Sequence, residues 1–115
     1  MRLRGECTMK KLRVIIKSPT EQVGHEQDIP DSLEMYQKIV DGNIEVVPVD
    51  DWLLIMNEEG KWRKGPNFII FEDHIKDIIY GTVVVVGSDK SEFADVPIDL
   101  IEWASKLNEW RKRAL

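Results

Sequence analysis

The sequence predicts an α+β domain: a small mixed sheet of about four to five strands, with a helix in the N-terminal half, a short helical turn and a C-terminal helix packed on one face. Three observations support this class. β-branched runs recur along the chain, two segments combine helix-capping residues with a single apolar face, and the elements do not follow a regular βαβ repeat. We expect one domain over residues 9–115.

Size and composition favour a cytoplasmic protein without a cofactor. The 115 residues are enough for one hydrophobic core, and the single cysteine, Cys7, has no disulfide partner within the chain. No apolar run approaches the roughly 18 residues that cross a bilayer, and the basic start lacks the apolar core of a signal peptide.

The first eight residues, MRLRGECT, match no secondary-structure pattern and precede a second methionine. Arg4, Gly5 and Glu6 can be encoded by bases that resemble a bacterial ribosome-binding site. We therefore expect residues 1–8 to be an upstream extension and the domain to start at Met9.

Charge is distributed unevenly along this chain of net charge −5. Residues 1–18 hold six bases and one acid, residues 19–59 hold one base and eleven acids, and residues 60–115 hold nine of each. An acidic middle repels phosphates, so binding to nucleic acid is disfavoured. The middle is either a solvated acidic face or a surface for a basic partner.

In the first half, LRVIIKS is expected to be a strand, and VGHEQDI either a short strand or a loop. The clearest helix is PDSLEMYQKIVDGN, with Asp31 as its cap, Glu34 completing a capping box and Gly42 ending it. Its expected apolar face is Leu33, Tyr36, Ile39 and Val40.

After this helix, IEVVPV is expected to be an edge strand, because Pro48 cannot donate to a sheet ladder. Asp50 and Asp51 then favour a tight reversal into the strand WLLIM. The NEEG turn that follows ends on Gly60, which can take a positive φ.

FIIF is too short to classify alone, whereas EDHIKDIIYG has the spacing of a helical turn that ends on Gly81. TVVVVG is the most β-branched segment and should be central, buried on both faces. The final helix is expected to open at Asp95, with Pro97 at its first helical position. Its expected apolar stripe is Leu100, Trp103, Ala104, Leu107 and Trp110.

From Ile39 to Gly87, the string IVDGNIEVVPVDDWLLIMNEEGKWRKGPN and the later DIIYGTVVVVGSD resemble a family of small uncharacterised proteins, a domain of unknown function. Its members are encoded mostly by phages, prophages and conjugative elements of Gram-positive bacteria. They carry an arginine after the Pro-Asn pair, where this chain has Phe68. The resemblance implies no catalytic residues; it implies an accessory protein that binds host machinery.

The segment KWRKGPN is the best candidate for a ligand site. Its cations and its tryptophan suit a phosphate or carboxylate together with a stacked ring. The alternative is a plain solvated loop after a turn. The candidate ligand-binding residues are Lys61, Trp62, Arg63, Lys64 and Asn67.

The last helix offers a second candidate surface. Trp103 and Trp110 lie seven residues apart, hence on nearly one face, and Arg111 follows directly. One hypothesis is that they contact a partner or a second copy of the chain. The alternative is that the tryptophans pack in the core.

The sequence contains few residues in patterns typical of catalytic or metal-binding sites. His25 and His74 lie in different segments, neither with the i, i+4 spacing of helical metal ligands, and no phosphate-binding glycine motif occurs. We therefore expect no catalytic residue and no metal.

The leading functional hypothesis is a non-enzymatic, acidic binding protein of a phage or mobile element that inhibits or modulates a host protein. No membrane role is expected, nucleic acid is disfavoured, and a homodimer is an open alternative. The second hypothesis is a protein that binds a small anionic or nucleotide-like ligand through residues 61–67.

Overall fold

The computed structural model describes residues 10–115. The expected start at Met9, the upstream extension and Cys7 therefore lie outside the described residues.

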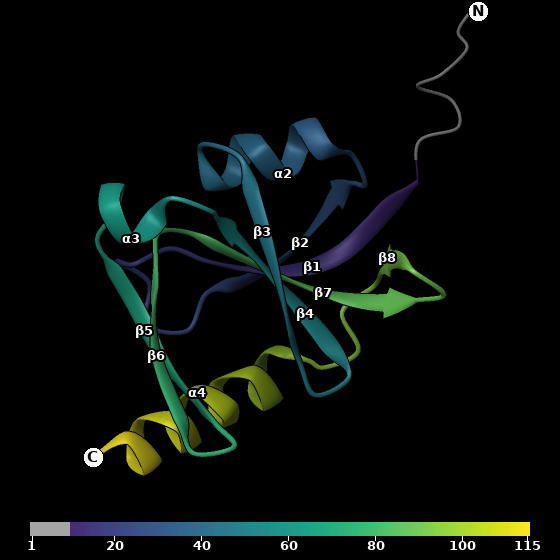
Figure 1. Cartoon of the computed structure of the whole chain (residues 1–115). Coiled ribbons are helices and arrows are strands. Elements are labelled where there is room, and N and C mark those ends of the chain that lie inside the picture. Colours follow the sequence, from purple (N-terminus) through teal and green to yellow (C-terminus); the bar gives the residue numbers. More distant parts are fainter. Residues whose placement is uncertain (1–9) are drawn as a thin grey trace, which may run out of the picture.

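A six-stranded sheet forms the centre of the molecule (Figure 1). Its strands are β1 (Lys11–Lys17), β2 (His25–Pro30), β3 (Ile44–Val49), β4 (Trp52–Asn57), β7 (Val83–Asp89) and β8 (Glu92–Ala94). The order is β2-β1-β7-β4-β3, and β8 pairs with the end of β7. The α+β class is confirmed, but the expectation of a mixed sheet is wrong, because every pairing among the described strands is antiparallel.

Strand positions follow from local chemistry where the sequence is most distinctive. The central place of TVVVVG is confirmed: Val83, Val84, Val85 and Val86 are fully buried in β7. The edge position of β3, which contains Pro48, is also confirmed. The two-residue loop at Asp50 and Asp51 reverses the chain between β3 and β4, as expected.

A separate hairpin contains the segment expected to be a helical turn. It consists of β5 (Pro66–Glu72) and β6 (Ile75–Tyr80), which brings the number of strands to eight, above the four to five expected. Ile75 and Ile78 fit a helical spacing, but in the strand both are exposed, and Ile79 alone of the three isoleucines joins the core. The turn residues Asp73 and His74 both have positive φ, as in the type I′ turns of hairpins.

Helices pack on both faces of the sheet, so the expectation of helices on one face is wrong. α2 (Leu33–Val40) covers the face that carries Leu12, Val14 and Val84. α4 (Leu100–Ala114) and the β5–β6 hairpin cover the other face (Figure 1). Because side chains alternate along a strand, neighbouring valines of β7 enter the two different cores.

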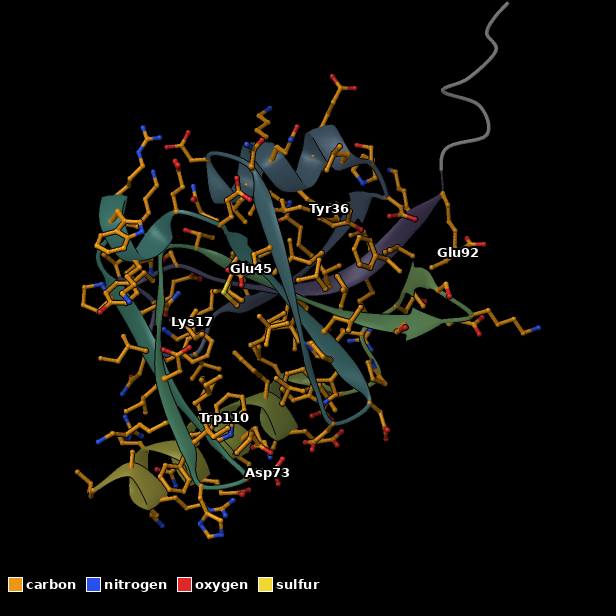
Figure 2. All side chains as sticks on the ribbon, viewed as in Figure 1. Lys17, Tyr36, Glu45, Asp73, Glu92 and Trp110 are labelled. Atoms are coloured by element: carbon orange, nitrogen blue, oxygen red, sulfur yellow. The ribbon has the colours of Figure 1, made fainter. Side chains whose placement is uncertain are left out.

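The helix caps differ from those expected. Ser32, not Asp31, caps α2, since its hydroxyl accepts from the N–H of Met35 at 3.1 Å. Asp31 instead accepts a hydrogen bond from the hydroxyl of Tyr36 at 2.8 Å; Figure 2 shows Tyr36 between α2 and the sheet. This helix ends at Asp41, which takes the left-handed conformation expected of Gly42.

α4 starts later than expected. Asp99 caps it in a capping box with Glu102, so Pro97 precedes the helix instead of opening it. None of the described helices is both long enough and apolar enough to cross a membrane.

Candidate functional site

The predicted loop at 61–67 begins with a short helix, α3 (Gly60–Arg63). Gly60 is required here for close packing and not for a positive φ, because a Cβ would lie 2.8 Å from the carbonyl oxygen of Tyr80. This contact places α3 beside β6 and turns Trp62 outward, where the side chain is 80% exposed.

Two of the three loop cations are paired with carboxylates. Arg63 contacts Glu59 at 3.3 Å, and the ammonium of Lys64 lies 2.5 Å from a carboxylate oxygen of Asp41. The hydrogen bond from Lys64 lowers the pKa of the Asp41 carboxyl. Lys61 instead lies over the ring of Trp62, with its ammonium 5.3 Å from the ring centroid.

A pocket of about 220 Å³ lies beside Trp62, between β3, β4, α3 and β6. We call it the Trp62 groove. Its charged lining groups are three acids and one base, Glu45, Glu58, Asp77 and Lys61. Its apolar lining includes Val47 and the half-exposed Ile78. The groove thus joins an exposed aromatic ring to a mainly acidic hollow.

A second pocket, of about 170 Å³, lies where the end of β1, the start of β5 and α4 meet. We call it the Lys17 pocket. Its lining residues are Lys17, Gln22, Asn67, Phe68, Ile69, Leu107 and Arg111. Asn67 and Arg111, predicted to belong to two different sites, therefore line one pocket. The structure separates Asn67 from Lys61 and Trp62, which line the groove.

Asn67 uses its whole side-chain amide within the protein. Its Nδ2 donates to the carbonyl oxygens of Lys17 at 2.9 Å and Gly81 at 2.7 Å. Its Oδ1 accepts a hydrogen bond from the ammonium of Lys17. Asn67 therefore joins β1, β5 and the β6–β7 turn, and positions the Lys17 ammonium.

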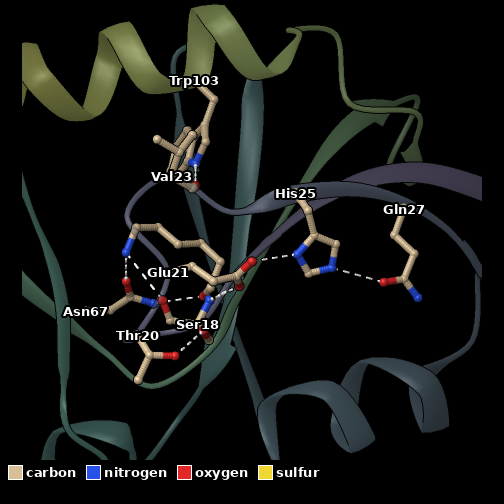
Figure 3. Close-up of polar contacts among 9 residues, drawn as sticks. Ser18, Thr20, Glu21, Val23, His25, Gln27, Asn67 and Trp103 are labelled. Atoms are coloured by element: carbon tan, nitrogen blue, oxygen red, sulfur yellow. Dashed lines mark hydrogen bonds and ion pairs between the residues drawn. The ribbon is translucent and has the colours of Figure 1, made fainter.

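Lys17 is the one buried cation among residues 10–115, with 4% of its surface exposed. Burial lowers the pKa of Lys17, while the charge of Glu21 raises it. The Glu21 carboxylate is bound elsewhere, accepting from the N–H of Ser18 at 2.9 Å and contacting Nδ1 of His25 at 2.8 Å (Figure 3). No carboxylate among the described residues lies within 4 Å of the Lys17 ammonium.

The histidines do not meet. His25 lies in β2, and its hydrogen bond to Glu21 raises the pKa of the imidazole. His74 lies in the β5–β6 turn. Within residues 10–115, no three His, Cys, Asp or Glu side chains are grouped closely enough to hold a metal ion.

Trp103 and Trp110 are fully buried, so of the two alternatives for them, core packing is the one observed. Trp103 donates its indole N–H to the carbonyl oxygen of Val23 at 2.8 Å, and Trp110 donates to Glu72. Trp110 belongs to α4 (Figure 2), and its ring stacks on Phe68. Neither indole reaches the surface of the described structure, so a contact of these two side chains with a partner has no support from it.

Sequence reasoning missed Lys17 as a site residue. The available signal was strand alternation: Lys17 lies two residues after the buried Ile15, and so points to the same inner face. Lysine is almost never fully buried unless it is paired, so an inward lysine in a strand is an unusual feature of this sequence.

The fold is that of a small antiparallel α+β domain with a helix on each face of its sheet and two surface pockets. The chain belongs to the family described as "Domain of unknown function (DUF3846)", whose model matches residues 9–109. This match agrees with the resemblance to a family of unknown function. A search of curated proteins and a search of solved structures found no match.

Proposed function

We propose that this chain is a non-enzymatic accessory protein of a phage or mobile element, and that it binds a protein of its bacterial host in the cytoplasm. The observation that carries this proposal is Trp62, a residue that is 80% exposed and lines an acidic groove. Exposed tryptophans next to pockets are typical of residues that dominate binding energy in protein interfaces.

The chemistry of the Trp62 groove favours a basic partner. Glu45, Glu58 and Asp77 outnumber Lys61 in its lining, so an arginine or lysine side chain would meet complementary charge there. Glu45 and Glu58 belong to the stretch of residues 19–59, which holds eleven acids and one base.

An extended segment suits this location best. β3 is the last strand of its sheet, and Glu45 and Val47 of β3 line the groove. A partner strand laid along β3 would bond to its free backbone groups and place alternate side chains into the groove. Pro48 limits this pairing to the first half of the strand, because it has no N–H to donate.

The alternative of a small anionic ligand held by the whole 61–67 loop is less favoured. Arg63 and Lys64 are occupied by Glu59 and Asp41, and Asn67 lies in a different pocket. Lys61 and Trp62 are thus the two predicted loop residues that can serve a ligand in the groove.

Site-specific photo-crosslinking tests the proposal. A benzophenone amino acid replaces Trp62 in one protein and Ile101 in a matched control, because Ile101 is equally exposed, at 81%, but lies on α4 (Figure 1). After irradiation in host lysate at moderate salt, we expect a discrete crosslinked host protein from position 62 alone. Its yield should fall when Glu45→Lys is added, because that change reverses a groove charge.

Equal crosslinking from positions 62 and 101, or none at all, would refute the groove as the binding surface. Native mass spectrometry of the same preparations determines whether the chain is a monomer or a homodimer, which the groove proposal does not require.

A further inference from the structure

We propose that the Lys17 pocket binds the phosphate group of a small phosphorylated metabolite. This site is separate from the Trp62 groove and does not depend on the proposed partner.

The first argument is charge. Lys17 and Arg111 both line a pocket whose other lining residues include no acid, in a protein of net charge −5. Among the described residues, the Arg111 guanidinium has one hydrogen bond, to the neutral amide oxygen of Asn108 at 3.1 Å, and no ion pair. Two cations at one hollow, neither with a carboxylate within 4 Å among those residues, favour an anion between them.

The second argument is preorganisation. The Lys17 ammonium is held by Asn67 Oδ1 and, at 3.4 Å, by the carbonyl oxygen of Ser18, which leaves one of its three protons free. Asn67 is in turn fixed by its two bonds to backbone carbonyls. The apolar wall, Phe68, is held by stacking on Trp110 and edge contact with Trp103. The Lys17 side chain is therefore locked before any ligand arrives.

The third argument is energetic. A buried cation without a paired carboxylate costs stability, and such a cost persists where the charge has a use. Burial lowers the pKa of Lys17 even though the charge of Glu21 raises it, which is the direction expected when the charged form is less favourable in the protein than in water. A bound anion would offset this cost.

The size of the pocket sets the ligand class. A volume of about 170 Å³ is below the roughly 300–1,000 Å³ of pockets for drug-sized ligands. It admits one charged group, with the remainder of the ligand outside. A phosphate has several acceptor oxygens. The pocket offers them three kinds of donor, the ammonium of Lys17, the guanidinium of Arg111 and the side-chain amide of Gln22.

Titration with inorganic phosphate tests the proposal, at constant ionic strength and in a buffer free of other oxyanions. We expect a saturable rise in the melting temperature of the full chain, and heat of binding by calorimetry. Lys17→Met should abolish both effects and still unfold cooperatively in phosphate-free buffer, because removing a buried cation offsets the loss of its hydrogen bond to Asn67.

Arg111→Gln is the second variant, because Arg111 is exposed and its replacement leaves the core intact. It should raise the apparent Kd for phosphate at least about tenfold. Lys112→Gln is the matched control: it removes the same charge from the next residue of α4, outside the pocket, and should leave the Kd unchanged. Trp62→Ala should also leave it unchanged, which separates this site from the groove.

Three results would overturn the proposal. The first is no saturable effect of phosphate on the wild-type chain. The second is an equal loss of affinity in Lys112→Gln and Arg111→Gln, which would indicate general charge attraction. The third is tighter binding of acetate than of phosphate, which would make the site one for carboxylates.

Discussion

At the scale of single residues, the side chain of Asn57 connects the end of α2 to the turn after β4, a role that the sequence around it does not indicate. It is buried, and its Nδ2 donates to the carbonyl oxygens of Val40 at 3.1 Å and Asp41 at 2.9 Å. Its Oδ1 accepts from the N–H of Glu59 at 2.7 Å. One amide thus satisfies the C-terminal end of α2 and starts the turn that carries Trp62.

Asn57→Ala should lower the free energy of unfolding by about 1–3 kcal/mol, because it leaves buried backbone groups without partners. Asn43→Ala is the control: Asn43 is exposed, its two side-chain bonds are 3.3 Å long, and the change should cost less than about 0.5 kcal/mol. Urea denaturation measures both. An equal loss of unfolding free energy in both variants would mean that the buried hydrogen bonds of Asn57 stabilise the fold no more than the exposed ones of Asn43.

At the scale of elements, two hairpins turn through residues of positive φ without a glycine. Asp73 and His74 connect β5 to β6, and Lys90 and Ser91 connect β7 to β8, all four with positive φ. Type I′ turns of this kind usually contain Asn-Gly or Asp-Gly. The absence of glycine explains why the β5–β6 hairpin was not predicted, and it leaves backbone strain in each turn.

His74→Gly should relieve that strain and raise the free energy of unfolding by up to about 1 kcal/mol. Lys76→Gly is the comparison, because Lys76 is an exposed β6 residue without a positive φ. Glycine at position 76 should lower the free energy of unfolding by about 0.5–1 kcal/mol. Chemical denaturation gives the sign of the change in the free energy of unfolding for both variants. A less stable His74→Gly would show that the imidazole stabilises the protein by more than the backbone strain costs.

At the scale of the whole molecule, one lysine joins the two sheets to α4. The Lys106 ammonium lies 3.2 Å from Asp50 in the β3–β4 turn and 3.0 Å from Glu72 at the end of β5. Burial alone would lower the pKa of Lys106, but the hydrogen bonds to Glu72 and Asp50 raise it. The hydrogen bond from Trp110 and the contact with Lys106 lower the pKa of the Glu72 carboxyl.

A lowered carboxyl pKa predicts the direction of acid sensitivity. The stabilising contribution of Glu72 is complete above its ordinary pKa of 4.5 and is lost as the pH falls through the lower pKa of the folded protein. Glu72→Gln should therefore lower the melting temperature at pH 7 and reduce its fall below about pH 5. Glu92→Gln, at an exposed position outside these contacts, should follow the wild-type curve. If the melting temperature of Glu72→Gln fell below about pH 5 as steeply as that of the wild type, Glu72 would not be the source of the acid sensitivity.

The sequence by itself determined the elements whose signals are local. The β-branching of Val83–Val86 placed the central strand, and Pro48 placed an edge strand. Helix-start patterns located two helices, although Ser32 and Asp99 cap them in place of the expected Asp31 and Asp95. The 61–67 segment was expected to be a loop, but its first residues belong to α3 and its last two to β5. The ion pairs of Arg63 and Lys64 were not predicted, because they depend on how the chain packs.

Tertiary structure alone decided which face each helix covers, the β5–β6 hairpin and both pockets. The isoleucines of β6 fit a helix as well as a strand, and pairing with β5 determined the outcome. Lys17 meets Asn67 across 50 residues of sequence, and its burial follows from that contact. Local propensity determines what a segment can form, whereas burial and charge pairing arise between segments distant in sequence, and on these the proposed sites depend.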